Sequence, residues 1–526
     1  MGLLGKIFGG SKKSKEPAPQ MAPVNRNKIV CPYCFSEFAH HEVHFRVDKN
    51  SIQASVMSED DIMDKYGDDE NRMYEEMAKA KIARKFQRQV HDEKLSDFWM
   101  GRFKVKPEQR DDKEWNYPVI TPEDTDMLFK GSAKEGHFFS NDDNQPFLYK
   151  LKDYYGNPAT TRLCPHCHNV ISPTYGKYPV VFISVVGITG SGKTVYLNQL
   201  IENLQNRLAC AGLAVTAPFN MRSVDKIRKG RFLPMSTQEG IMYPPMMVNM
   251  APVKSGTEQK RTLVFYDIAG ENCTDQQKLE SFGPYLAKSE AIILLVDPKQ
   301  FITFNDNAGD NPATTVVNAL VGFFGNQASK PLIATTLSKS DTLKKLTYDF
   351  TMEDIIRADS VLFKKIDWKP NVKGFYKSSY AQMAGEMVRL RKHIDPSGEL
   401  DGPLQTEFKE RAYFAISALG VEVQPQYNIG TSSDPFYIAI SEEAANKIEV
   451  LLQDNDEEPE LYNGKRRVLL GVNPDTDEDV VWDFDTIKEA KEKVRYLMVS
   501  EPDPYRIEEP LLWILSRMNI IESVEA

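Results

Sequence analysis

Apolar runs that end in glycine or a polar residue recur along the middle of the 526-residue chain. Such runs, bounded by turn residues, are typical of strands buried on both faces of a sheet. They span residues 180–186, 263–268, 291–296, 331–337 and 413–416. Val195, Tyr196 and Leu197 open a helix after the first run. This alternation predicts an α/β fold, with a mostly parallel central sheet flanked by helices.

The hydrophobic pattern before these runs is helical. Residues 59–70 are strongly acidic, and apolar residues then recur near helical spacing among many lysines and arginines. The spacing predicts an amphipathic helix over residues 71–90, with apolar positions at Met73, Met77, Ile82, Phe86 and Val90. Its basic side is expected to be solvated, or else to hold an acidic partner or nucleic acid. The stretch after it has enough aromatic residues to fold, among them Trp99, Trp115, Phe138 and Phe147.

The pattern after the fifth run predicts an inserted α+β region over residues 421–503. We expect a helix near residues 442–452, a hairpin around residues 473–475 and another helix near residues 486–497. This insert is expected to decorate the core.

The sequence predicts a helix near the C-terminus and a flexible segment at the N-terminus. Pro510, followed by an apolar face with Trp513, predicts a closing helix over residues 509–515 that packs on the core. Residues 1–27 are rich in glycine and proline and are predicted to be flexible. The alternative for residues 1–15 is weak peripheral contact with an anionic membrane, through an apolar start and a lysine flank.

Composition and charge narrow the class of protein. A chain of 526 residues with 41% hydrophobic content can fold into two or three domains. Its formal net charge of -10 argues against a nucleic-acid surface along the whole chain, although a local basic patch stays compatible. No apolar run approaches the roughly 20 residues that span a bilayer, and no secretory signal begins the chain. We therefore expect a cytoplasmic protein.

Four of the six cysteines form two matching CPxC turns. Cys31 and Cys34 frame the first turn, and Cys164 and Cys167 frame the second. Together they predict a four-thiolate zinc site in a ribbon split by an insert, although redox motifs or ordinary core cysteines are alternatives. Histidines near the turns could replace a thiolate, but with four cysteines at hand we expect them to be solvated or core residues: His40, His41, His44, His166 and His168.

A glycine-rich loop directly follows the first run of the predicted sheet. Its residues are Gly187, Ile188, Thr189, Gly190, Ser191, Gly192, Lys193 and Thr194. The glycines let backbone N–H groups wrap phosphates, Lys193 can reach the β and γ oxygens, and the Thr194 hydroxyl can ligate Mg²⁺. The order of strand, loop and helix predicts a P-loop.

The second run ends in Asp267-Ile268-Ala269-Gly270, a DxxG motif. Asp267 would hold Mg²⁺, and the backbone N–H of Gly270 would sense a γ-phosphate. The alternative for Asp267 is a helix cap or turn. Glu271 follows, and it can orient an attacking water, although a carboxylate beside the γ-phosphate predicts slow unaided hydrolysis. A partner or a dimer would then complete the site; the alternative is that Glu271 points to solvent.

The fourth and fifth runs lead into loops that suit guanine. Ser338-Lys339-Ser340-Asp341 resembles the NKxD motif, with Ser338 where asparagine is usual. The Asp341 carboxylate can accept from the N1–H and exocyclic amine of guanine, and the Lys339 stem can cover the base. Ser417-Ala418 follows a predicted strand and resembles the SAK loop whose backbone contacts guanine. The alternative is a charged loop without a base-reading role.

In this order the motifs resemble the translation-factor-like (TRAFAC) class of P-loop GTPases. The CPxC ribbon running into GITGSGKT, with DIAGE downstream, looks like the bacterial double-GTPase family within that class. The resemblance implies nucleotide bound at the carboxyl ends of the strands. It also implies a first-switch threonine that closes on Mg²⁺, for which position favours Thr237. Arg228 and Arg231 lie just upstream; basic loop residues are more often solvated, and an arginine finger in cis is the alternative role for them.

These patterns divide the chain and define its expected function. The predicted parts are a flexible segment (1–27), a split zinc ribbon (28–178) with an insert (46–160), a P-loop core (179–420), the α+β insertion (421–503) and the closing helix (504–526). The leading hypothesis is a GTP- and Mg²⁺-dependent switch that acts on an unidentified protein partner. An ATP-dependent ATPase or kinase and a nucleotide-bound scaffold that never turns over are the alternatives.

Overall fold

The computed structural model describes most of the chain, with gaps. The described ranges are 28–47, 56–88, 92–103, 105–106, 118–128, 137–140, 147–153, 156–188, 190–209, 213–216, 227–234, 245–252, 260–268, 283–301, 312–325, 330–345, 374–428, 431, 433–445, 448, 461–462, 465–472, 476, 478–483 and 494–524.

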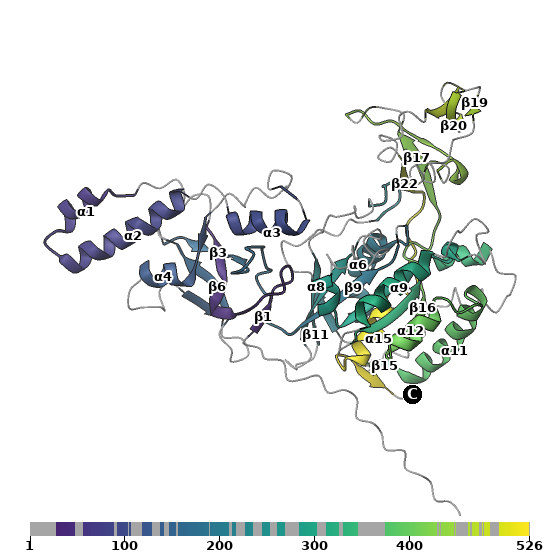
Figure 1. The fold of residues 1–526 in the computed structure, drawn as a ribbon, viewed down its shortest axis with the longest axis horizontal. Coiled ribbons are helices and arrows are strands. Elements are labelled where there is room, and N and C mark those ends of the chain that lie inside the picture. The colour runs from purple at the N-terminus through teal and green to yellow at the C-terminus, as the bar shows by residue number, and fades with distance from the viewer. Residues whose placement is uncertain are drawn as a thin grey trace, which may run out of the picture.

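A seven-stranded mixed sheet forms the centre of the molecule, in the order β10-β11-β12-β9-β13-β14-β16 (Figure 1). Five neighbouring strands run parallel, while β10 and β11 form an antiparallel edge. The strands are β9 (Val180–Val186), β10 (Leu213–Thr216), β11 (Met246–Pro252), β12 (Arg261–Asp267), β13 (Ala291–Val296), β14 (Leu332–Leu337) and β16 (Arg411–Ala415). The five apolar runs are therefore the five parallel strands, and the predicted fold class is confirmed.

The residues of these strands explain their central position. Every residue of β13 is buried, and in β9 only Val180 is partly exposed, as expected for parallel strands covered on both faces. Because the five strands are parallel, the loops that follow Val186, Asp267, Val296, Leu337 and Ala415 leave the same edge of the sheet. That edge is where ligands bind in open α/β sheets.

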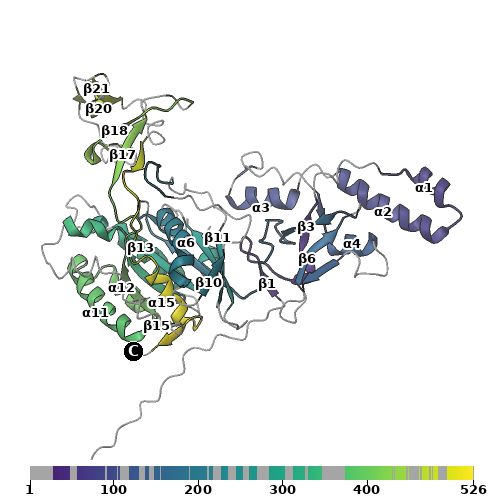
Figure 2. The same cartoon turned by 180° about the vertical axis from the view of Figure 1, so that it is seen from behind.

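Helices flank the sheet (Figures 1 and 2). Trp513 of the closing helix is only 2% exposed, so both this helix and its place in the core are confirmed. A short parallel pair, β15 (Gly374–Tyr376) and β23 (Glu522–Val524), lies beside it. The flanking helices are α6 (Lys193–Ala209), α8 (Gly283–Lys288), η8 (Pro298–Gln300), α9 (Pro312–Phe324), η9 (Ser340–Lys345), α11 (Lys377–Ile394), α12 (Asp401–Glu407) and α15 (Glu509–Arg517).

The N-terminal part combines small sheets with helices. β1 pairs with β2, β3 lies between β4 and β8, and β6 lies between β5 and β7. The predicted helix over residues 71–90 is α2, and its Ile82 is buried. The elements are β1 (Lys28–Val30), β2 (Glu37–Ala39), η1 (His40–Glu42), β3 (His44–Arg46), α1 (Glu59–Tyr66), α2 (Glu70–Arg88), α3 (Glu93–Phe103), β4 (Val119–Ile120), α4 (Pro122–Leu128), β5 (His137–Ser140), β6 (Phe147–Lys152), β7 (Pro158–Ala159) and β8 (Thr161–Leu163).

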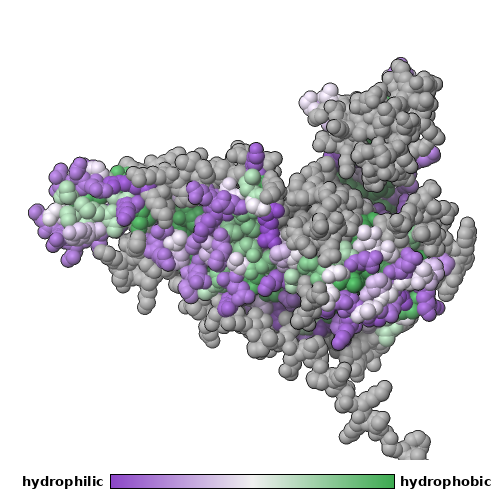
Figure 3. Space-filling view, in the orientation of Figure 1, coloured by the Kyte–Doolittle hydropathy of each residue, from purple (hydrophilic) through white to green (hydrophobic). Residues whose placement is uncertain are grey.

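Helices α1 and α2 project away from the nucleotide core, and hydrophobic residues lie among hydrophilic ones on their surface (Figures 1 and 3). Met63 on α1 is 49% exposed and Tyr74 on α2 is 56% exposed. None of the helices in the described ranges combines the length and apolar character that a bilayer crossing requires.

The C-terminal insertion builds its own sheet, in the order β18-β17-β22, and a small core separate from the main one. The predicted hairpin is confirmed, because β20 pairs with β21 across residues 473–475, and residues 442–445 are helical as expected. The strands are β17 (Val423–Asn428), β18 (Tyr437–Ala439), β19 (Leu461–Tyr462), β20 (Lys465–Val472), β21 (Asp479–Asp483) and β22 (Val494–Met498).

The helix expected near residues 486–497 is wrong at its C-terminal end. Residues 484–493 lie outside the described ranges, but Val494–Met498 form β22 and pair with β17. A β-branched residue and a tyrosine at alternating positions suit a strand, and the backbone partners that β17 supplies outweigh the helical spacing of the sequence.

Candidate functional site

The glycine-rich loop connects β9 to α6 at the carboxyl edge of the sheet. A Cβ atom on Gly187 would lie 2.4 Å from the carbonyl oxygen of Leu295 and 2.7 Å from the Ser191 hydroxyl. Gly190 and Gly192 have φ angles of +80° and +82°, a left-handed conformation that other residues rarely adopt. The loop therefore needs glycine at all three positions, for close packing at one and for backbone conformation at two.

Lys193 folds back into this loop. Its ammonium group donates to the carbonyl oxygens of Gly187 at 2.8 Å and Ile188 at 3.0 Å, and the residue is only 6% exposed. The hydroxyl of Ser191 is buried and accepts or donates no hydrogen bond within the described residues. A buried cation in a glycine-rich loop that leads into a helix N-terminus is the chemistry that binds phosphate. Thr189 lies outside the described residues.

A magnesium position is suggested where α6 meets the end of β12. The Thr194 hydroxyl donates to Oδ2 of Asp267 at 2.7 Å. A hydroxyl and a carboxylate beside a phosphate loop match the hard oxygen ligands that Mg²⁺ prefers, so these residues fit the ion. Gly270 and Glu271 of the DxxG segment, and Thr237, lie outside the described residues.

Lys339 connects the P-loop to the next loops of the sheet. It adopts a positive φ of 50°, and its Cε lies 3.9 Å from the place where a Gly192 Cβ would stand. Its ammonium group forms an ion pair with Oδ2 of Asp297 at 2.8 Å. Asp297 was missed as a site residue, although its position at the end of the third apolar run was a usable signal. The Lys339 stem therefore lies against the P-loop and is held there by a buried carboxylate.

The predicted base-reading residues meet at the ends of β14 and β16. Oδ1 of Asp341 accepts a hydrogen bond from the Ser417 hydroxyl at 2.7 Å, and that hydroxyl accepts from the Gly420 N–H at 2.8 Å. Ser338, which replaces the usual asparagine, donates to the Val296 carbonyl through its backbone N–H at 2.9 Å and its hydroxyl at 3.3 Å. Its short side chain is thus committed to β13.

Hydrogen bonds fix the two base loops to each other. The Ser340 hydroxyl donates to the Leu337 carbonyl at 3.0 Å and the Ile416 carbonyl at 2.8 Å. Ala418 follows Ser417 and is partly buried against the core. The structure thus brings the P-loop, Asp267, Lys339, Asp341 and the Ser417–Ala418 loop to one edge of the sheet. Arg228 and Arg231 are exposed and lie on a segment paired with β22.

Comparison with known families assigns this region. Residues 181–370 match the family model Double-GTPase 2. The chain thus contains a region similar to the double-GTPase family. The matched residues include the P-loop, the Asp267 strand and the Lys339 loop, which agrees with the family that the sequence motifs resemble.

One curated relative is SaeC of Mycolicibacterium smegmatis, which is named for a proposed role in ESX-1 scaffolding and assembly. It is 24% identical over 211 residues, which cover 35% of this chain and 52% of the relative. The chain thus spans about half the length of the curated relative it matches.

Two solved structures are also similar. One is the signal recognition particle receptor SRb-GTP/SRX complex from Chaetomium thermophilum, with 13% identity and a TM-score of 0.23, covering 47% of this chain and 93% of that one. The other is the GTP-bound Ski7 GTPase-like domain from S. cerevisiae, with 11% identity and a TM-score of 0.22, covering 46% and 43%.

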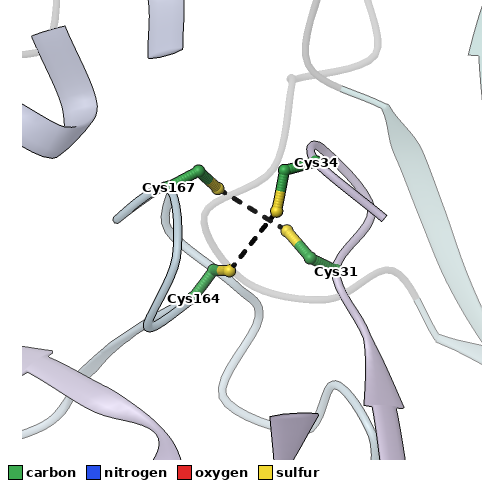
Figure 4. Close-up of side chains that lie close together, drawn as sticks. All are labelled: Cys31, Cys34, Cys164 and Cys167. Atoms are coloured by element: carbon green, nitrogen blue, oxygen red, sulfur yellow. Dashed lines mark hydrogen bonds between the residues drawn. The ribbon is translucent and has the colours of Figure 1, made fainter. Parts of the chain in front are cut away.

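The four CPxC cysteines form a compact cluster (Figure 4). The Sγ atoms of Cys31 and Cys167 lie 3.7 Å apart, as do those of Cys34 and Cys164, and all four lie within 4.8 Å of one another. A tetrahedral zinc ion with Zn–S bonds of about 2.3 Å needs sulfur separations of about 3.8 Å. A disulfide needs only about 2.0 Å, so the cluster has the geometry of a metal site.

The two turns that carry the cysteines share one local conformation. Phe35 and His168, each just past a turn, have positive φ angles of 57° and 51°. The N–H of Tyr33 points to the Cys31 sulfur at 3.3 Å, and that of His166 points to the Cys164 sulfur at 3.4 Å. Such donors stabilise negative charge on sulfur.

Partners outside the cluster also favour a bound cation. The Asn169 amide donates to the Cys167 sulfur at 3.2 Å and accepts from the Trp99 indole at 2.9 Å. Burial raises the pKa of the Cys31 and Cys167 thiols, so thiolates here need a positive charge. A bound zinc ion would supply that charge and hold the two turns together.

Histidines near the cluster take a different role. His168 Nδ1 lies 2.8 Å from Oδ1 of Asp92, and its Nε2 lies 3.0 Å from Nδ1 of His44. Arg46 completes the network by donating to Asp92 at 2.8 Å. Burial, followed by repulsion from His168, lowers the pKa of His44 to about 3. Within the described residues the potential metal group holds cysteines alone, as the sequence led us to expect.

The first cysteine turn docks directly on the nucleotide sheet. Tyr266, the residue before Asp267, donates its hydroxyl to the Pro32 carbonyl at 2.8 Å, and Tyr285 of α8 donates to the Tyr33 carbonyl at 2.8 Å. The Phe35 ring stands edge-on to the Tyr285 ring at 4.8 Å. The ribbon thus contacts the elements on either side of the DxxG segment.

Proposed function

We propose that the chain is a GTP-binding molecular switch that requires Mg²⁺, hydrolyses GTP slowly unless stimulated, and acts through protein partners. The observation that carries this proposal is the position of Lys339 and Asp341. Lys339 lies along the P-loop, while Asp341 stands beside Ser417 as an acceptor for the base. A carboxylate acceptor suits the two donors on guanine, whereas adenine offers no such pair.

The proposed roles follow from these positions. Lys193 exchanges its carbonyl partners for the β and γ phosphate oxygens, and Thr194 and Asp267 hold Mg²⁺, the Asp267 carboxylate through water. Backbone N–H groups from Gly187 to Thr194 wrap the phosphates. Mg²⁺, when bound, neutralises charge that builds up on the phosphates.

Hydrolysis depends in this proposal on residues outside the described ranges. Gly270 would sense the γ-phosphate, Glu271 would orient the attacking water, and Thr237 would close on Mg²⁺. A carboxylate at Glu271 is repelled by the γ-phosphate, which is why we propose that a partner or a second copy stimulates turnover.

The metal, the partners, the origin and the location of the protein belong with this proposal. The cysteine geometry supports zinc as the ribbon metal. The relative's name supports protein partners, and its bacterial source supports the bacterial origin that the sequence suggested. The cytoplasmic location, the domain boundaries and a role for Arg228 or Arg231 stay predictions.

Nucleotide binding and turnover test the proposal. Labelled GDP should be displaced by GTP and not by ATP at matched concentrations with Mg²⁺, and phosphate should be released from GTP in a single-turnover assay. Thr194→Ala should abolish the dependence on Mg²⁺. Equal displacement by ATP would instead favour an ATPase.

A scaffold that binds GTP without turnover is the second candidate, because the curated relative is named for scaffolding and assembly. Tight GTP binding with no phosphate release, at any protein concentration, would support it over the switch.

A further inference from the structure

The segment at residues 227–234 lies against the C-terminal insertion, far away in the chain. Gly230 N–H donates to the Met498 carbonyl at 2.8 Å, Met498 N–H donates to the Arg231 carbonyl at 3.0 Å, and Leu233 N–H donates to the Tyr496 carbonyl at 2.8 Å. Phe232 and Leu497 form an antiparallel bridge. The segment is thus a short fourth strand added to β22 of the β18-β17-β22 sheet.

Side chains reinforce this backbone pairing. The Phe232 ring packs on the Tyr437 ring of β18, with centroids 4.5 Å apart. The Arg495 guanidinium lies over the Phe232 ring, 4.8 Å from its centroid, and also donates to the Leu233 carbonyl at 3.3 Å. Phe232 therefore contacts both an aromatic ring and a cation that the insertion supplies.

The same insertion begins directly after the proposed guanine loop, and the returning chain contacts that loop. Ser417 and Tyr505 bridge at the points where the chain leaves and returns, and Asp503 N–H donates to the Leu419 carbonyl at 2.7 Å. A Cβ atom on Gly420 would lie 1.8 Å from the Asp503 carbonyl oxygen, so the two stems touch. A continuous set of backbone contacts therefore connects the Asp341–Ser417 pair to the sheet that holds Phe232.

The position of residues 227–234 in the chain relates this contact to the first switch. Residues 227–234 follow the P-loop helix α6 and precede β11, and Thr237 comes shortly after them. Under the proposed function this is the segment that leads into the first switch. Fixing its backbone in advance removes part of the conformational entropy that GTP binding would otherwise have to overcome.

We propose that the insertion at residues 421–503 is a clamp that positions the first-switch segment, with Phe232, Arg495 and Tyr437 as the positioning residues. This inference rests on the proposed function. The clamp favours the GTP-bound state, because only the γ-phosphate requires the first switch to be ordered. GDP binding does not require an ordered first switch and is therefore independent of the clamp.

Binding of a non-hydrolysable GTP analogue and of GDP, compared between variants, tests the clamp. For Phe232→Ala and Arg495→Ala, we expect the affinity for the analogue to fall by about three- to tenfold, while the affinity for GDP stays within about twofold. Phe232→Tyr keeps the ring and should behave like the wild type. Phe436→Ala, which removes a 50% exposed aromatic next to Tyr437, is the matched surface control.

Amide hydrogen exchange without nucleotide is the second readout. The N–H groups of Gly230, Leu233 and Met498 should be protected in the wild type and exposed in Phe232→Ala, while the P-loop strand β9 keeps its protection. This pattern would show that a variant still folds.

The outcomes separate the two proposals. A wild type that binds neither guanine nucleotide sinks the proposed function, and the clamp with it. A wild type that binds both, with variants that lose amide protection yet keep the same ratio of affinities, overturns the clamp alone. A rise in affinity for the analogue also overturns it, because the contact would then restrain the switch.

Discussion

At the scale of single residues, the proposed function assigns recognition to three side chains: Lys193 for phosphate, Lys339 for the contact between loops, and Asp341 for the base. None acts alone. Lys339 depends on Asp297, which is 5% exposed and lies 2.8 Å from its ammonium group, and Asp341 depends on Ser417. A motif names the residue that touches ligand, but the buried partner that orients it has to be found in the fold.

The closest backbone approach in the P-loop gives a direct prediction. Gly187→Ala places a methyl group against the Leu295 carbonyl, so we expect the free energy of unfolding to fall by about 1–3 kcal/mol and nucleotide binding to be lost. Gly402→Ala is the matched control. It lies in α12 with open space around it, and should change stability by no more than about 1 kcal/mol, toward higher stability. Urea unfolding of both variants measures this, and equal effects would contradict the packing argument.

Glu290 predicts a pH dependence of stability. Burial raises its pKa to about 7, and it lines a cavity of about 250 Å³ together with Lys28, Lys177 and Lys288. Because the folded state holds this proton more tightly than the unfolded chain, the contribution is present below about pH 4.5 and is lost as pH rises through about 7.

The matched variants isolate that contribution. Relative to Glu290→Gln, the wild type should lose up to about 3 kcal/mol of stability between pH 4.5 and 7.5. Glu202→Gln, at an exposed position on α6, should track the wild type throughout. Urea unfolding across this pH range decides, and parallel curves for wild type and Glu290→Gln would contradict the burial argument.

At the scale of elements, the cysteine ribbon shows which features a sequence reveals and which it hides. The paired CPxC turns identified the four clustered cysteines, and the sulfur separations of 3.7 Å agree with a tetrahedral site. The docking of the ribbon on Tyr266 and Tyr285 was not predictable, because each hydroxyl bonds a carbonyl on a turn that is distant in the chain. Any tyrosine has the same donor, so only the fold selects these two.

The metal itself is a testable prediction. We expect about one zinc per purified chain, and Cys34→Ser or Cys164→Ser should abolish it. Because the free energy of zinc binding stabilises the ribbon, these variants should also show faster amide exchange in β1, β2 and β8. Cys210→Ser, outside both CPxC turns, should keep the metal. A cysteine cluster without zinc in the wild type would contradict the assignment.

At the scale of the whole molecule, the sequence was most informative where burial is two-sided. The five parallel strands are short apolar runs that alternate with helices, so the fold class could be predicted, although the order of the strands in the sheet could not. The helix expected near residues 486–497 failed at β22, because that strand owes its conformation to pairing with β17 and with residues 230–233. Long-range pairing between distant segments leaves no periodic signal in either.

The same limit applies to the candidate site. The P-loop, Asp267, Lys339, Asp341 and the Ser417 loop were found by spacing along the chain. The Asp297 ion pair and the Phe232 clamp depend on contacts between distant segments and emerged only from the structure.

The most direct test of guanine recognition varies the nucleotide base and residue 341 in the same experiment. GTP, ATP and XTP compete against a labelled guanine nucleotide with Mg²⁺ present, for wild type and Asp341→Asn. We expect the wild type to bind GTP, and Asp341→Asn to lose GTP by at least about 100-fold and to gain XTP, since asparagine can donate where the xanthine ring carries an oxygen. If ATP competes equally and Asp341→Asn changes nothing, Asp341 does not read the base, and the claim of a guanine-specific switch is wrong.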